Sequence, residues 1–111
     1  MIRFGERFIP AILDGTKTMT VRLEDKRRVR EIEAVVVDYD YPFPRAWIQY
    51  TYKDCLPLNA VDVTHEGFTH IDDLVNFLRG VYGSARIPNS EITVWQYTFK
   101  VVPEPEIKEE S

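Results

Sequence analysis

The final regular segment of the chain, Ile92–Val102 (ITVWQYTFKVV), constrains the fold more than any other feature. Apolar side chains alternate along it, and one face has Trp95, Tyr97, Phe99 and Val101. Alternation over such a length, with aromatic and β-branched residues, indicates a long strand packed against a core on one face. The chain is therefore expected to be built mainly on β-strands.

Four further segments have strand patterns, and they are Thr18–Leu23, Ala34–Tyr39, Ala46–Asp54 and Leu58–Thr64. The apolar run AVVVDY, which begins at Ala34, predicts a strand in the interior of a sheet.

The first and third of these segments have two distinguishable faces. Met19, Val21 and Leu23 share one face of the first, and Thr18, Thr20 and Arg22 share the other. In the third segment, Ile48, Tyr50 and Tyr52 are expected to face the core.

Two short helices are also predicted. Residues Glu6–Asp14 place Phe8, Ile9, Ile12 and Leu13 on one stripe, with Pro10 in the first turn and Gly15 as the C-cap. The second helix follows Thr69, a candidate N-cap, and ends at Gly83; its apolar stripe consists of Ile71, Leu74, Val75, Leu78 and Tyr82.

These elements predict an α+β fold. Five or six strands with two short helices suit a small mixed β pseudobarrel with helices over its openings. A chain of 111 residues has room for one domain, which we place at residues 1–102. Residues 103–111 contain four glutamates and one lysine, and we expect them to form an acidic, flexible tail.

Cysteine content and hydropathy indicate the compartment. The only cysteine, Cys55, has no partner for an intramolecular disulfide, and no secretory leader is evident after Met1. No apolar run approaches the ~20 residues that span a bilayer. These observations predict a cytoplasmic protein that does not enter a membrane. Cys55 itself is interpreted as a small buried hydrophobe.

Positive charge is concentrated in residues 17–30, although the net charge of the chain is −4. Six basic side chains stand there beside only Glu24 and Asp25. Such a cluster attracts phosphate, so Arg27, Arg28 and Arg30 are candidate RNA contacts. A solvated loop explains the same composition.

The stretch GTKTMTVR, from Gly15 to Arg22, is the main candidate site. Lys17 precedes Thr20 by three residues at the bend from helix to strand. A threonine hydroxyl is a weak nucleophile that needs a neighbouring base, and a lysine serves as one only when its pKa is lowered. Arg22, on the same face as Thr20, would bind a phosphate or an oxyanion. An ordinary half-exposed strand is the alternative.

Other candidates are weaker. Trp47 lies among polar neighbours on its strand, and its indole would stack on a base if it is not part of the core. Tyr39, Tyr41 and Phe43 would form an adjoining aromatic wall. His65 and His70 lack Cys or Glu partners at zinc spacing, so we expect no metal site and no cofactor.

Three segments in this order resemble the ASCH domain, a branch of the PUA-like superfamily. RFIPAILDGTKTMTVR fills the G-x-K-x-x-[TE]-x-R signature with Gly15, Lys17, Thr20 and Arg22. HEGFTHIDDLVNFLRGVYG is similar to the family's second helix, and ITVWQYTFKVV resembles its closing strand. The resemblance implies a PUA-like pseudobarrel with a groove suited to RNA or a modified nucleoside.

One bacterial branch of this family consists of acetylcytidine amidohydrolases. The resemblance implies Lys17 as the base, Thr20 as the nucleophile and Glu66 as the proton donor for metal-free deacetylation of an N-acetylated cytidine. Other ASCH proteins are described as ribonucleases, and further members only bind, so a ribonuclease and a non-catalytic RNA-binding module are the alternatives.

The chain departs from the family in one loop. Many relatives have a Gly-Asp turn after the first motif, whereas this chain reads EDKRRVREIEA, without glycine. We expect that loop to be built differently.

Overall fold

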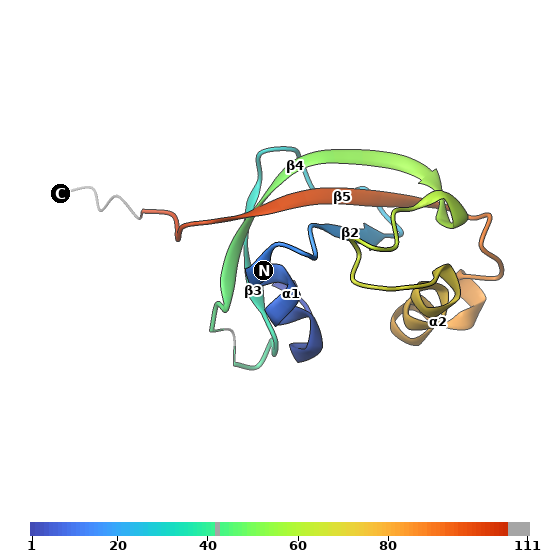
Figure 1. The fold of residues 1–111 in the computed structure, drawn as a ribbon, viewed down its shortest axis with the longest axis horizontal. Helices are drawn as coiled ribbons and strands as arrows, with labels where there is room; N and C mark the ends of the chain where they lie inside the picture. The colour runs from blue at the N-terminus through green and yellow to red at the C-terminus, as the bar shows by residue number, and fades with distance from the viewer. Residues whose placement is uncertain (42, 107–111) are drawn as a thin grey trace.

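The computed structural model describes residues 1–41 and 43–106. Five strands form one sheet, and they are β1 (Ile2–Arg3), β2 (Met19–Arg22), β3 (Ile32–Val36), β4 (Ala46–Pro57) and β5 (Thr93–Val102). Their order across the sheet is β1-β3-β4-β5-β2. The two α-helices are α1 (Ile9–Asp14) and α2 (Ile71–Tyr82), and both lie on the same side of the long β4–β5 pair (Figure 1).

The sheet is mixed and curls into a half-barrel, which confirms the predicted fold class. β1 pairs parallel with β3, and the other neighbours are antiparallel. The longest pairing runs between β4 and β5, from Trp47 opposite Val102 to Pro57 opposite Thr93. β1 and β2 are the two edge strands, and residues of both line a pocket.

A β-bulge in β4 reverses which side chains face the core. The register steps from Tyr50, opposite Phe99, directly to Tyr52, opposite Thr98, so Thr51 is the extra residue. Tyr50 is fully buried, whereas Tyr52 is 58% exposed. The prediction that Tyr52 faces the core is therefore wrong, because the inserted residue turns this side chain to the opposite face. The prediction that Cys55 is buried is also wrong, since Cys55 is exposed.

The segment Leu58–Thr64 is not a strand, contrary to prediction. It begins with a 3₁₀ turn, Leu58–Ala60, and continues in turns to His65. Its apolar residues still pack inward, since Leu58 is fully buried and Val61 is 8% exposed. The fifth strand is instead β1, which the sequence pattern did not predict because two residues are too few to show alternation. The interior position predicted for the AVVVDY run is confirmed, because β3 pairs with β1 and β4.

The first helix follows its local sequence signals. A 3₁₀ turn (Glu6–Phe8) leads into α1, Pro10 lies in the first turn, and Gly15 ends the helix with φ 83°. Positive φ is strained for residues with a Cβ, so glycine suits this cap. The predicted apolar stripe is wrong at Leu13, which is 57% exposed.

The second helix also follows its sequence pattern, except at its start. Leu74, Val75 and Leu78 are buried, and Gly83 is the C-cap. The N-cap is His70 rather than the predicted Thr69, and its side chain makes no capping hydrogen bond.

The core has two parts. One contains residues of α1 and of the sheet, with Tyr50, Tyr97 and Phe99 at its centre. The other joins α2 to β2 and β5 through Leu74, Val21 and Val94. Phe68 packs against both parts, so the segment before α2 links them.

The loop that lacks glycine turns on a non-glycine residue in the left-handed region. Arg30 has φ 77° and is the only such non-glycine residue in ranges 1–41 and 43–106. Its backbone is held on both sides, because its N–H donates to the carbonyl of Tyr50 (2.7 Å) and its carbonyl accepts from Gln49 Nε2 (3.1 Å). The backbone of this loop therefore takes its left-handed turn at Arg30.

No helix within these ranges is long and apolar enough to cross a bilayer. Residues 103–106, the part of the acidic tail that is described, are exposed coil, and the rest of the predicted tail lies outside the described residues.

Candidate functional site

A pocket of about 450 Å³ lies between the two edge strands and the second helix. Arg3 and Phe4 line it from the β1 side, and Thr20 and Arg22 line it from β2. These edges are at opposite ends of the strand order, so the curl of the sheet brings them to one pocket. α2 closes the remaining side with Leu74, Phe77, Leu78 and Val81.

Lys17 is buried at this pocket, with 3% of its surface exposed. Its ammonium donates to the carbonyl of Met19 (2.8 Å), the carbonyl of Glu66 (2.5 Å) and the Oε2 of Glu66 (3.4 Å). Three donors thus meet three acceptors, which is the full hydrogen-bonding capacity of a lysine. The ammonium also lies 5.5 Å from the ring centre of Phe4 and 5.1 Å from that of Phe8.

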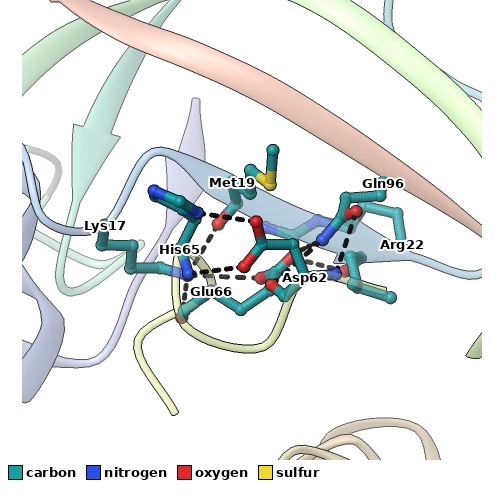
Figure 2. A network of polar contacts seen from close by, with 8 residues as sticks. Lys17, Met19, Arg22, Asp62, His65, Glu66 and Gln96 are labelled. Carbon is teal, nitrogen blue, oxygen red and sulfur yellow. Dashed lines mark hydrogen bonds and ion pairs between the residues drawn. The ribbon is translucent and has the colours of Figure 1, made fainter. Parts of the chain in front are cut away.

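Glu66 is equally buried, at 2% exposure, and its carboxylate joins two partners (Figure 2). Oε2 pairs with Lys17, and Oε1 accepts from Gln96 Nε2 at 3.1 Å. Gln96 lies on β5 and also donates to the carbonyl of Asp62 (3.3 Å). The loop before α2 is therefore attached to the sheet at the site.

Gly67 permits the close packing of this loop. Its φ is 92°, and a Cβ there would lie 3.5 Å from the Phe8 ring and 3.6 Å from Cδ of Lys17. A larger residue would be strained in its backbone by the positive φ, although its Cβ would make only ordinary van der Waals contacts with Phe8 and Lys17.

Burial shifts both members of the ion pair toward their neutral forms. Desolvation lowers the pKa of Lys17, reinforced by the charge of Arg22, although Glu66 opposes this shift. Desolvation also raises the pKa of Glu66, against the opposing effects of Lys17 and Gln96. The low dielectric of the buried site disfavours both charges. Transfer of a proton from the ammonium to the carboxylate would replace the ion pair with a neutral amine beside a carboxylic acid.

Thr20 and Arg22 complete the polar lining. Thr20 is 2% exposed, and its hydroxyl forms no hydrogen bond with another described residue. The hydrogen bond expected between the Lys17 amine and this hydroxyl is absent as well, since the amine donates to Met19 and Glu66 instead. Arg22 donates from Nη1 to the carbonyl of Val21 (2.9 Å), and its guanidinium carbon lies 5.8 Å from the ring centre of Phe4.

The other predicted contact residues differ in whether they line the pocket. Arg27 lines the pocket, but its Nε is paired with Glu33 Oε1 at 2.8 Å. Arg28 and Arg30 are exposed in the loop that follows β2 and are not among the lining residues. Trp47 lies on β4, half-buried, and does not line the pocket either.

The aromatic wall predicted beside Trp47 is only partly present. Tyr39 reaches the pocket, whereas Tyr41 and Phe43 are more than 70% exposed and lie outside the lining. The pocket instead takes most of its aromatic surface from Phe4, Phe8, Phe68, Phe77 and Tyr82.

Sequence reasoning missed two polar residues at the site. Gln96, which is 7% exposed, had a detectable signal, because it is a polar residue between Trp95 and Tyr97 in a strand rich in apolar residues. Arg3 had none, since only the pairing of β1 with β3 brings it to the pocket. Within the described part of the chain, no three His, Cys, Asp or Glu side chains gather as a metal site would require.

Comparison with solved structures identifies the architecture. An ASCH domain from Lactobacillus crispatus JV V101 superposes with a TM-score of 0.66 at 20% identity, over 84% of this chain and 69% of that one. The fold is that of the ASCH domain. Protein EF3133 from Enterococcus faecalis V583, of family DUF984, has a TM-score of 0.72 at 19% identity, over 90% of this chain and 74% of that one.

A third solved structure, hypothetical protein PH0355, superposes with a TM-score of 0.65 at 15% identity, over 89% of this chain and 94% of that one. No protein-family model matches the chain, and no curated protein matches it in sequence. The chain is therefore similar to these proteins in three-dimensional structure, at low sequence identity.

Proposed function

We propose that this ASCH-fold domain binds RNA or a modified nucleoside in the pocket and removes the acetyl group from N-acetylated cytidine. The observation that supports this proposal is the lining of one pocket by Lys17, Thr20 and Glu66, the three residues that the family resemblance implied. Aromatic rings around them suit a flat base, and pockets of this size commonly take small organic ligands.

The buried ion pair supplies both an acid and a base for the reaction. After the proton moves from Lys17 to Glu66, the neutral amine accepts the hydroxyl proton of Thr20 as its oxygen attacks the acetyl carbon. The carbon–nitrogen bond then breaks, and Glu66 gives its proton to the leaving exocyclic nitrogen. Thr20 retains the acetyl group as an ester.

Water completes the cycle. Glu66, now ionised, takes a proton from the attacking water, and Lys17 returns a proton to the oxygen of Thr20. Acetate and cytidine leave.

The test is release of cytidine from acetylcytidine at pH 6–9, followed by chromatography. We expect turnover by the wild type and a loss of about 10²–10⁴-fold for Glu66→Gln, which removes one proton-transfer group. Thr20→Val removes the hydroxyl and retains the shape, so it is expected to be inactive, while Thr20→Ser keeps measurable activity. Absence of turnover by the wild type across this range would remove the hydrolase proposal.

A non-catalytic RNA-binding module is the second candidate, favoured by the exposure of Arg28 and Arg30 near the pocket-lining Arg27. It predicts RNA binding that weakens with salt and with neutralisation of these arginines, because each neutralised phosphate releases counterions. Unchanged RNA affinity in the triple alanine variant would exclude it. Ribonuclease activity would appear instead as RNA cleavage that survives a chelator and is lost in Lys17→Ala.

A further inference from the structure

Positively charged side chains outnumber negatively charged ones in the lining of the pocket. Arg3, Lys17, Arg22 and Arg27 line it, and among the residues that the structure describes Glu66 is the only acidic one that does so. Lys17 is paired with Glu66, and Arg27 is paired with Glu33 from β3. Among residues 1–41 and 43–106, no carboxylate pairs with the remaining two guanidinium groups, those of Arg3 and Arg22.

Both unpaired arginines are anchored through one donor each. Arg3 donates from Nε to the carbonyl of Val37 (2.9 Å), and Arg22 donates from Nη1 to the carbonyl of Val21 (2.9 Å). A guanidinium has five N–H donors, so each retains donors for a ligand. Anchoring to a backbone carbonyl also limits the rotamer freedom that binding would remove.

Phe4 also lines the pocket and follows Arg3 directly in the chain. Its ring centre is 5.8 Å from the guanidinium carbon of Arg22. One arginine therefore lines the pocket from the β1 edge and the other from the β2 edge. Guanidinium groups favour phosphate because their fork of donors matches its oxygens.

We propose that Arg3 and Arg22 form a phosphate subsite of this pocket, so that its ligand is a phosphorylated nucleotide or an RNA phosphodiester rather than a free nucleoside. This inference rests on the proposed function for the base-binding part of the pocket. Phe4 and the neighbouring rings contact the base, and the two arginines neutralise the phosphate attached to its ribose.

The experiment uses the full-length Thr20→Val protein, which does not consume the ligand. Calorimetric titrations compare acetylcytidine, its 5′- and 3′-monophosphates and a dinucleotide that contains acetylcytidine. We expect at least one phosphorylated ligand to bind about 10-fold or more tightly than the nucleoside at low salt, with the gain shrinking as salt rises. A preference for a monophosphate indicates free nucleotide, and a preference for the dinucleotide indicates RNA.

Substitutions at the subsite then test its residues. Arg3→Gln is expected to abolish the gain, and Arg3→Lys to retain part of it, because the charge remains but the fork is lost. Lys100→Gln, which removes an equal charge from exposed β5, is the control and should preserve the gain. Equal affinity of the nucleoside and all phosphorylated ligands would overturn the subsite while leaving the proposed function intact.

A titration with inorganic phosphate separates the two proposals further. Phosphate is expected to shift the side-chain NMR signals of Arg3 and Arg22 in a ¹⁵N-labelled protein. Those shifts without any nucleoside binding or turnover would support the subsite and refute the proposed function. No shift with phosphate, together with equal affinity for every nucleoside ligand, would refute the subsite.

Discussion

Removing either member of the buried Lys17–Glu66 pair should change stability with opposite dependence on pH. In Glu66→Gln, the ammonium of Lys17 remains buried without its counter-charge, and breaking such a pair typically costs about 3–5 kcal/mol. Loss of a proton from the ammonium would remove this penalty. With an unfolded pKa of ~10.4, deprotonation costs about 4.6 kcal/mol at pH 7 and about 1.9 kcal/mol at pH 9.

The direction of this pH dependence follows from the number of protons that the native and unfolded states bind. The pKa of Lys17 is already lowered by desolvation, and the loss of Glu66 lowers it further, so native Glu66→Gln binds fewer protons than its unfolded state. Its stability therefore rises with pH by up to about 1.4 kcal/mol per unit until the unfolded pKa is reached.

The reverse holds for Lys17→Met. Desolvation raises the pKa of Glu66, and the missing ammonium no longer opposes this shift, so the native variant binds the additional proton. Protonating a carboxyl with an unfolded pKa of ~4.3 costs about 3.7 kcal/mol at pH 7 and about 1.0 kcal/mol at pH 5. This variant is therefore expected to regain stability as the pH falls.

Urea unfolding at pH 5–9, followed by the fluorescence of Trp47 and Trp95, measures these effects. Differences from the wild type are compared at each pH, because other titrating groups are common to all variants. The double variant Lys17→Met/Glu66→Gln is the control, since it has neither titrating group and should show neither single variant's trend with pH. Parallel stability curves for both single variants and the wild type would refute a buried pair at this position.

Three further predictions concern residues outside the ion pair, each measured by urea unfolding at pH 7. Arg30→Gly should stabilise the protein by about 1 kcal/mol, because it relieves a left-handed φ of 77°; a loss of stability would contradict the strain. Gly67→Ala should cost about 1–2 kcal/mol, since the new Cβ is held at φ 92° beside the Phe8 ring; a neutral effect would indicate a different loop conformation. Tyr50→Phe should change stability by less than about 0.5 kcal/mol, because the buried hydroxyl has no hydrogen-bond partner among the described residues. Tyr97→Phe is its matched control and should cost about 1 kcal/mol, because it removes a 2.8 Å bond to Asp25; equal costs for the two tyrosines would refute this reasoning.

Local signals were reliable where neighbouring residues determine the backbone. Pro10 and Gly15 bracket the first helix as predicted, and the apolar spacing of Leu74, Val75 and Leu78 correctly located the second. These features depend on φ preferences and on a repeat within one helix, both of which are readable from adjacent positions.

Predictions failed where contacts between residues far apart in the sequence determined the local structure. Tyr52 alternates correctly with Ile48 and Tyr50, yet a bulge enforced by the pairing with β5 turns it outward. Leu58 and Val61 are apolar and buried, but they enter the core from turns rather than from a strand. At these two residues burial follows hydrophobicity, whereas strand formation needs a partner strand.

The order of residues in this chain was sufficient to indicate two helices, a set of strands and a polar stretch, Gly15–Arg22, with lysine, threonine and arginine at fixed spacing. Its tertiary structure decided that Lys17 is paired with a carboxylate 49 positions away, and that Arg3 and Arg22 line the same pocket. The physical reason is that burial, counter-charges and pKa shifts depend on distances through space, which curling of the sheet creates and which spacing along the chain does not encode.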